Sequence, residues 1–385
     1  MKIGIVCYPT YGGSGVVATE LGKALANKGH QVHFVAYEQP ARLHQFFANI
    51  YFHEVSFTNY PLFVFPPYET ALASKLVDVV KFQELDVIHV HYAIPHASAA
   101  FLAKKILAEQ GIHIPVVTTL HGTDITLVGK DSTFEPVVSF SINQSDGVTT
   151  VSESLKQETF QYFEVTNDIE VIPNFIDLEA FKKYNKDHFK KAIAPQGEAI
   201  VMHVSNFRKV KRIADIVNIF HGIRQQKPAK LLLVGDGPER KKAEALCREL
   251  SICQDVRFLG KQQAVGELLA IADLFLMPSE KESFGLAALE AMACEVPVIS
   301  SNAGGLPEIN IDGQTGFMSD VGDVNSMIEK SLQILSSENS LQTFRKNALS
   351  QAKRFDIENI VPLYENYYQK IIEKCKAKHQ TEAVL

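Results

Sequence analysis

The sequence predicts an α/β protein with two doubly wound, Rossmann-like halves. Short apolar runs bounded by turn residues alternate with helical patterns along almost the whole chain. This alternation is typical of a mostly parallel sheet with helices on both faces. The pattern then restarts near the middle of the chain, and 385 residues is long for a single hydrophobic core. Two domains are therefore expected.

The first half supplies four strand candidates and two helical patterns. Helices are expected at Val17–Asn27 and Ser98–Glu109, where apolar residues recur with helical spacing. Strands are expected at four short apolar runs, Ile3–Cys7, Gln31–Ala36, Val87–Val90 and Val116–Leu120.

The second half repeats this organisation. Its strand candidates are Ala199–Val204, Lys230–Val234, Val256–Leu259, Leu274–Met277 and Val296–Ser300. We expect the join at Ile172-Pro173, because a proline after the strand-like run IEVI interrupts sheet pairing. The resulting domains are 1–172 and 173–356.

Composition limits the classes of function. A net charge of -6 argues against general nucleic-acid binding. Five cysteines are odd in number and contain no C-x-x-C pair, which favours a reducing compartment and gives no zinc motif. No signal peptide is visible, and no apolar run reaches the roughly 18 residues of a membrane span. We expect a cytoplasmic protein without stable membrane association.

A glycine cluster after the first strand raises two alternatives. Gly13-x-Gly15-x-x-Ala18, with Glu38 about twenty residues on, nearly matches the dinucleotide fingerprint. An NAD-dependent oxidoreductase is therefore one interpretation, and a plain strand-to-helix turn is another. However, Pro9-Thr10-Tyr11 lengthens the loop before the glycines. We expect Gly13 and Ser14 to offer backbone N–H groups and a hydroxyl to an anionic or sugar ligand.

The segment 278–308, PSEKESFGLAALEAMACEVPVISSNAGGLPE, predicts a nucleotide-sugar site. Ser283-Phe284-Gly285-Leu286 is expected to open a helix whose N–H groups bind a diphosphate. Glu290, about two turns in, is expected to accept hydrogen bonds from a ribose diol, and Glu282 is placed to reach a sugar. Gly304-Gly305 follows a strand and allows close backbone approach.

These motifs resemble those of the retaining glycosyltransferases of family 4. The E-x7-E pair Glu282 and Glu290 is similar to that family's donor signature, and VRFLGK, ADLFLMPS and DGQTGF support the resemblance. The resemblance covers essentially the whole chain and implies the GT-B fold, with two Rossmann-like domains facing a cleft. Domain 1–172 would bind the acceptor, with the final helix at about 357–374 packing back on it, and 173–356 would bind the nucleotide sugar.

The family resemblance also implies a set of donor-binding residues. They are Gly13, Asn206, Arg208, Lys211, Gly260, Glu282, Ser283, Phe284, Gly285, Leu286 and Glu290. Lys211 keeps the family's lysine position on the diphosphate. Ser283 stands where a glycine is usual, and Asn206 stands where many members carry an arginine, which leaves Arg208 as a candidate replacement for that charge.

The N-terminal motifs narrow the implied substrates. YPTYGGSGVVATELG, HVHYAIPHASAA and TTLHGTDITLVG resemble the members that join N-acetylglucosamine to L-malate in bacillithiol biosynthesis. UDP-N-acetylglucosamine is then the expected donor and L-malate the expected acceptor. The candidate acceptor-binding residues are Ser14, Tyr92, His96, Thr123 and Asn206, and the candidate catalytic residues are His121, Lys211 and Glu282.

The expected chemistry uses no metal and no cofactor. Sugar transfer requires a departing diphosphate to be stabilised, a task for Lys211 and the helix N-terminus. The chain has no D-x-D stretch, and His89 and His91 on one strand face lack a third ligand. Other acceptors (inositol phosphate or a lipid), an NAD-dependent oxidoreductase and a non-catalytic sugar-nucleotide sensor stay open as alternatives. A homo-oligomer is possible.

Overall fold

The structure is a computed structural model that describes residues 1–56, 67–127, 131–184 and 187–382. The chain divides into two compact units. Unit 1 comprises Met1–Asn174 together with Ile357–Leu385, and unit 2 comprises Phe175–Asp356. Each unit contains a parallel sheet with helices, which confirms the predicted fold class.

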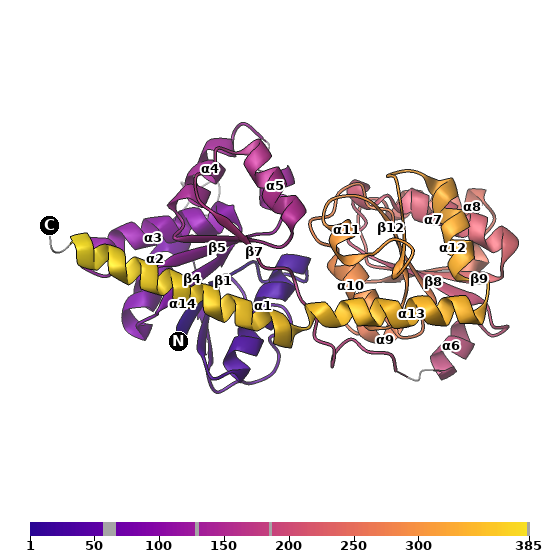
Figure 1. Ribbon diagram of the computed structural model, residues 1–385, viewed down its shortest axis with the longest axis horizontal. Helices are drawn as coiled ribbons and strands as arrows, with labels where there is room; N and C mark the ends of the chain where they lie inside the picture. Colours follow the sequence, from indigo (N-terminus) through magenta and orange to yellow (C-terminus); the bar gives the residue numbers. More distant parts are fainter. Residues whose placement is uncertain (57–66, 128–130, 185–186, 383–385) are drawn as a thin grey trace. The chain divides into compact units, whose positions relative to one another are not determined.

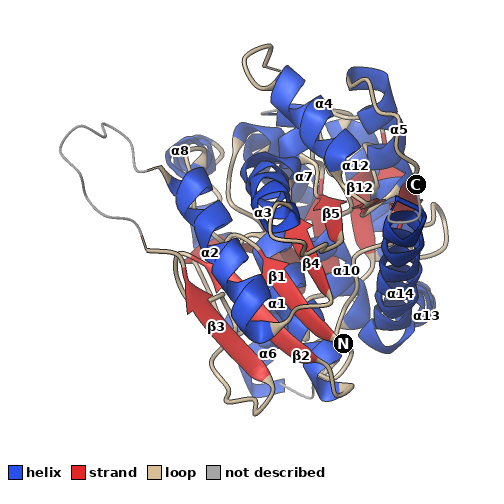
Figure 2. Cartoon of the chain, turned by 90° about the vertical axis from the view of Figure 1, so that its left-hand side faces the viewer, coloured by secondary structure: helices blue, strands red, loops and turns tan. Residues whose placement is uncertain are grey.

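Within its described residues, unit 1 has a seven-stranded parallel sheet in the order β3-β2-β1-β4-β5-β6-β7, part of which faces the viewer in Figure 2. The strands are β1 Lys2–Val6, β2 Gln31–Ala36, β3 Ile50–Glu54, β4 Val87–His91, β5 Val116–Leu120, β6 Gly147–Thr150 and β7 Ile169–Val171. The helices are α1 Gly13–Asn27, α2 Tyr68–Gln83, α3 Ser98–Ala108, α4 Glu135–Gln144, α5 Glu153–Tyr162 and α14 Ile357–Glu382.

The side chains of successive β4 residues point to opposite faces of this sheet. Ile88 and Val90 belong to the apolar cluster under α2 and α3. His89 instead meets α14, because Tyr368 OH lies 2.7 Å from its Nδ1 atom. The central strands β4 and β5 are buried along their whole length, which requires cover on both faces of the sheet.

The C-terminal helix α14 returns to unit 1 and is held there by polar contacts as well as by packing. In Figure 1 it runs beside α1. Glu365 accepts from His30 at 2.8 Å and from Lys28 at 3.2 Å, and the Tyr367 hydroxyl donates to the Val148 carbonyl at 3.1 Å. The helix continues to Glu382, beyond the expected end near residue 374.

Unit 2 repeats the strand order in its described residues, with a six-stranded sheet ordered β10-β9-β8-β11-β12-β13. The strands are β8 Ala199–Val204, β9 Ala229–Val234, β10 Val256–Gly260, β11 Leu274–Met277, β12 Val298–Ser301 and β13 Gly316–Ser319. The helices are α6 Asp187–Ile193, α7 Ile213–Gln226, α8 Arg240–Glu249, α9 Val265–Leu269, α10 Leu286–Ala293, α11 Leu306–Ile309, α12 Val324–Ile334 and α13 Glu338–Ala352.

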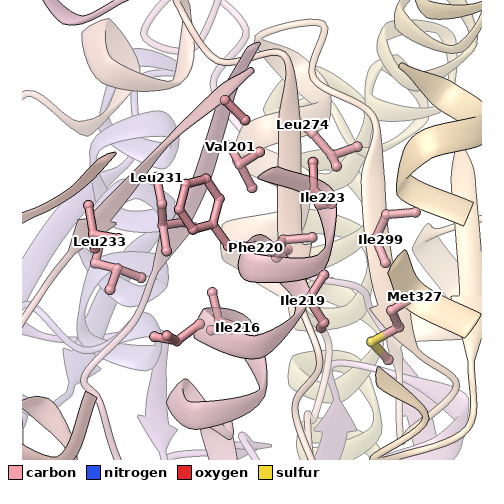
Figure 3. Close-up of a cluster of buried hydrophobic side chains, with 14 of the residues drawn as sticks. Val201, Ile216, Ile219, Phe220, Ile223, Leu231, Leu233, Leu274, Ile299 and Met327 are labelled. Carbon is pink, nitrogen blue, oxygen red and sulfur yellow. The ribbon is translucent and has the colours of Figure 1, made fainter. Parts of the chain in front are cut away.

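Helix α7 closes one face of the unit 2 sheet. Its apolar residues Ile216, Ile219, Phe220 and Ile223 follow helical spacing and are buried against side chains of β8, β9 and β11 (Figure 3). Burying a side chain of this size contributes about 1.5–3 kcal/mol. The core thereby fixes the strands whose carboxyl ends carry the candidate site residues.

No helix in the described part of the chain is both long and apolar enough to span a membrane.

Candidate functional site

Each unit has one topological switch point, where strand order reverses direction. It lies between β1 and β4 in unit 1 and between β8 and β11 in unit 2. Ligands of open α/β sheets bind outside the carboxyl ends of the strands at such points. The loops that follow β1, β4 and β5, and those that follow β8, β11 and β12, hold nearly all the predicted site residues.

Three predicted acceptor residues meet at the switch point of unit 1. The Ser14 hydroxyl, in the first turn of α1, lies 2.6 Å from the Tyr92 hydroxyl, and the Thr123 side chain also hydrogen-bonds Tyr92. Burial raises the pKa of Tyr92 to about 12, so this hydroxyl stays neutral at physiological pH. The cluster offers uncharged hydrogen-bonding groups.

The backbone of Tyr92 is strained. Its φ angle is +90°, a region that residues with a side chain rarely adopt. The Tyr92 N–H donates to the Thr119 carbonyl at 2.9 Å, which holds the turn after β4 against β5. Such strain persists only where the surroundings fix it, and it concentrates at functional positions.

The glycine loop before α1 is shaped by packing. A Cβ atom at Gly15 would lie 2.4 Å from the Thr10 carbonyl oxygen and 2.5 Å from that of Tyr8. Glycine is thus required at position 15 by the loop's own backbone. Gly13 is exposed at the first position of α1, where backbone N–H groups lack intrahelical partners.

His121 follows β5 and is oriented by a neighbouring strand. Its Nε2 atom lies 2.8 Å from His91 Nδ1, so the two rings meet edge to edge, with centroids 5.0 Å apart and planes inclined by 23°. Burial lowers the pKa of His121 to about 3 and that of His91 well below its usual value, so both rings are neutral. From the sequence, His91 is considered only for a metal site, which is rejected for lack of a third ligand. Among the described residues, no group of three or more His, Cys, Asp or Glu is placed to hold a metal ion.

Asp124 organises the backbone around His121. Its carboxylate accepts from the backbone N–H groups of Ala93 at 3.0 Å, Gly122 at 3.0 Å and His121 at 3.3 Å. Burial raises the pKa of this carboxyl to about 6 despite these donors. Asp124 therefore joins the loops that carry Tyr92 and His121.

His96 was predicted to contact the acceptor, but the structure buries it completely. Its exposed fraction is 0%, and its ring packs on Tyr8 with centroids 4.6 Å apart. The sequence showed that His96 follows a strand but not that the next turn covers it. In this arrangement the His96 side chain packs against Tyr8 in the interior and has no exposed surface for a ligand.

In unit 2, the switch point carries opposite charges. Lys211, in the turn after β8, forms an ion pair with Glu282, in the loop after β11. The same two loops are joined by the Glu280 N–H, which donates to the Val210 carbonyl at 2.7 Å. Asn206 and Arg208 lie on the same turn with exposed side chains.

Glycines let the loop after β12 lie against the loop after β11. A Cβ atom at Gly304 would lie 1.9 Å from the Glu282 carbonyl oxygen, and the Gly305 N–H donates to that oxygen at 2.9 Å. Gly260, at the end of β10 with φ +65°, accepts from the Gly235 N–H at 2.8 Å.

Helix α10 begins later than predicted, at Leu286. Gly285 precedes it with φ +100°, and Ser283 and Phe284 lie in the loop before it. Glu290 is consequently about one turn into the helix, not two. Its exposed fraction is 8%. The Phe284 side chain is buried edge-to-face against Phe355, so only its backbone is available to a ligand.

Comparison with known proteins assigns the family. The model of "Glycosyltransferase Family 4" matches residues 11–180, and that of "Glycosyl transferases group 1" matches residues 185–351. N-acetyl-alpha-D-glucosaminyl L-malate synthase of Bacillus anthracis is 47% identical over 378 residues, which cover 98% of each chain. The chain belongs to the family-4 glycosyltransferases.

Solved structures show the same fold for this glycosyltransferase. HepE of Anabaena, in complex with UDP and glucose, matches with a TM-score of 0.81 at 22% identity, over 96% of this chain and 99% of HepE. Sucrose-phosphate synthase of Thermosynechococcus elongatus matches with a TM-score of 0.79 at 22% identity, over 97% and 100%. These are GT-B proteins, and the retaining glycosyltransferase prediction is confirmed. The NAD-dependent oxidoreductase alternative has no support.

Proposed function

We propose that this glycosyltransferase moves N-acetylglucosamine from UDP-N-acetylglucosamine to the hydroxyl of L-malate, the first step of bacillithiol biosynthesis. The observation that carries the proposal is the 47% identity with an N-acetyl-alpha-D-glucosaminyl L-malate synthase across 98% of both chains. A match over this length includes the loops of both units, where substrate specificity is decided.

Unit 2 is the proposed donor site. Glu290 accepts hydrogen bonds from the ribose hydroxyls, and the backbone N–H groups at 284–286 contact the diphosphate at the start of α10. Glu282 reaches the sugar, and Lys211 carries the positive charge nearest the diphosphate. The other proposed donor contacts are Asn206 and Arg208 in the turn after β8, Ser283 in the loop after β11 and Gly260 at the end of β10.

Unit 1 is the proposed acceptor site, and Gly13 at the start of α1 is proposed as a further donor contact. The hydroxyls of Ser14, Tyr92 and Thr123 form one connected group that can donate to carboxylate oxygens. His121 contacts an oxygen of the donor sugar or orients the acceptor.

The proposed reaction retains configuration by a front-face route. The bond between the anomeric carbon and the phosphate oxygen breaks, the malate hydroxyl oxygen bonds to the same face, and the leaving phosphate accepts the hydroxyl proton. Lys211 is paired with Glu282 before the donor arrives, and pairing with the departing diphosphate is its catalytic contribution. A preorganised charge of this kind is worth about 2.7–4 kcal/mol in the transition state.

We also infer that transfer needs no metal ion or cofactor, because cationic side chains and a helix N-terminus can stabilise the leaving group. The five free cysteines are compatible with the cytoplasmic location that we propose. Activity that is unchanged after extensive chelation is expected; activity lost with chelator and restored by Mg²⁺ would contradict the metal-free mechanism.

A screen of UDP release tests the function. The protein is mixed with UDP-N-acetylglucosamine and either L-malate, inositol phosphate or no acceptor, and the product is identified by mass. We expect release that depends on malate and a product containing both moieties. Release only with inositol phosphate would assign another acceptor, and tight UDP binding without turnover would indicate a sensor. Binding of NADH but not UDP would overturn the transferase altogether.

A further inference from the structure

His91 has an unusual hydrogen-bonding position. It is fully buried on β4, and its Nδ1 atom is bonded to His121 Nε2, while its own Nε2 has no partner among the described residues. The ring packs against His89, with centroids 4.4 Å apart, and its Nδ1 edge faces His121.

Only one proton arrangement suits this pair. Between two neutral imidazoles, one nitrogen must donate and the other must accept. If His121 donated from Nε2, His91 would carry its proton on its own Nε2, and a buried N–H would be left without an acceptor. If His91 donates from Nδ1, only a lone pair is left unpartnered. Buried donors without partners are the rarer and costlier case.

We propose that His91 is a positioning residue that holds His121 in the tautomer protonated on Nδ1. The His121 side chain keeps 9% of its surface exposed, and its Nδ1 atom, unlike Nε2 of His91, is not a fully buried atom without a partner. His121 therefore presents an N–H donor. This inference rests on the proposed function for its substrate: the group that His121 meets must be an oxygen acceptor, such as a sugar hydroxyl oxygen or a phosphate oxygen.

His89 is the matched comparison within the same buried cluster. Its Nδ1 lies 2.7 Å from the Tyr368 hydroxyl and its Nε2 lies 2.6 Å from the Thr119 hydroxyl. Both of its nitrogens are thus satisfied by hydroxyls, which can donate or accept. That pairing leaves the tautomer of His89 free, in contrast to the tautomers of the His91–His121 pair.

Nitrogen NMR of the native full-length protein with ¹⁵N-labelled histidine tests the proposal directly. His121 is assigned from the signals lost in His121→Gln. We expect His121 with a protonated Nδ1 and an unprotonated Nε2 in the absence of substrate. A protonated Nε2 would overturn the proposal. Because no substrate is present, this outcome is independent of whether malate is the acceptor.

Two substitutions separate positioning from packing. His91→Asn keeps a side-chain N–H near the Nδ1 position but leaves a cavity, whereas His91→Leu fills the space and removes the donor. We expect His91→Leu to lose roughly tenfold to hundredfold in kcat, the size of effect seen when the partner that fixes a metal-binding histidine is removed, and to be the more heat-stable variant. His91→Asn should stay within a few-fold of native kcat.

Tyr368→Phe is the control, because it removes a buried hydroxyl from the same cluster without touching His121. It should leave kcat and the His121 tautomer signals unchanged. Equal kcat losses in His91→Leu and His91→Asn, or a loss that follows thermal stability, would show that His91 acts through packing and would contradict the proposal. If no acceptor gives turnover, the proposed function fails while the tautomer result still stands.

Discussion

The two units share one strand order but place different chemistry at the same point of the fold. In unit 1 two neutral hydrogen-bonded pairs lie at the switch point: Ser14 with Tyr92, and His121 with His91. In unit 2 the equivalent loops carry an ion pair, Lys211 with Glu282. The topology therefore sets where a ligand can bind, and a few loop residues decide its charge.

Burial explains much of this difference. In unit 1, His91 and His121 are buried, and burial disfavours charge, as their lowered pKa values show. Lys211 and Glu282 are partly exposed and neutralise one another as an ion pair. We expect substitutions in unit 2 to act mainly on donor and leaving group, and those in unit 1 mainly on the acceptor.

The largest effect on activity is expected from removing the Lys211 charge in unit 2. In Lys211→Ala we expect kcat to fall about 100- to 1000-fold, because the charge counts most as the diphosphate departs. UDP affinity should fall much less. Steady-state kinetics with UDP titration measures both, and exposed Lys209→Ala is the control. A kcat unchanged at saturating donor would remove Lys211 from the mechanism.

Asp124 provides a pH test confined to unit 1. Burial raises the pKa of its carboxyl to about 6, above the ordinary 3.8, so the native protein binds more protons than the unfolded chain between about pH 4 and 6. This carboxyl's contribution to stability is full below about pH 4 and is lost as pH rises through 6. The difference corresponds to at most about 3 kcal/mol.

The measurement compares the free energy of unfolding of native protein and Asp124→Asn across this pH range. The native protein should lose stability relative to the variant as pH rises from 4 to 6, and the two curves should run parallel above pH 7. Parallel curves throughout would mean that Asp124 does not titrate in this window.

Glu290→Ala tests the proposed contact between Glu290 and the ribose of the donor in unit 2. Loss of a charged hydrogen-bond acceptor is expected to cost about 1.5–3 kcal/mol, or roughly tenfold to hundredfold in the Kd of UDP. The KM for malate should hardly change. Calorimetric titration with UDP measures the effect, and exposed Glu329→Ala is the matched control. Native UDP affinity in Glu290→Ala would refute the ribose assignment.

The smallest effect is expected from the hydroxyl pair in unit 1. Ser14→Ala and Tyr92→Phe should each raise the KM for malate about tenfold or less, the value of one neutral hydrogen bond. Because the two hydroxyls are bonded, the double variant should cost less than the sum of the single changes. Additive effects would show that the two hydroxyls do not act together. A change in UDP affinity of the same size would contradict their assignment to the acceptor site. Exposed Tyr51→Phe serves as the control.

Much of the fold could be predicted from strands that are buried on both faces. The bounds of β2, β5, β8 and β11 are those expected from continuous apolar runs. The strands β3, β6 and β13 were missed. Glu54 and His53 make β3 polar, β6 is a four-residue GVTT, and β13 is a four-residue GFMS, so none shows a clear apolar run.

The sequence could indicate those parts of the candidate site whose residues lie close together along the chain. The segment after β11 carries both glutamates and its glycines in one stretch, and the placement of Lys211 against Glu282 follows from neighbouring strands. No role at the site was predicted for His91, because its hydrogen-bond partner His121 is thirty residues away, directly after the next strand. The HVH alternation shows which face His91 occupies, but only the β4–β5 register places it against His121.

The most direct test of the account is the preference among acceptors. With UDP-N-acetylglucosamine as donor, kcat/KM is measured for L-malate, L-lactate and 3-hydroxypropionate, which each keep a hydroxyl while the last two lack one carboxylate. A dianion beside a diphosphate must be held by specific donors, so we predict that losing either carboxylate lowers kcat/KM by orders of magnitude. Equal values for malate and lactate would contradict the assignment and leave a family-4 transferase with a different acceptor.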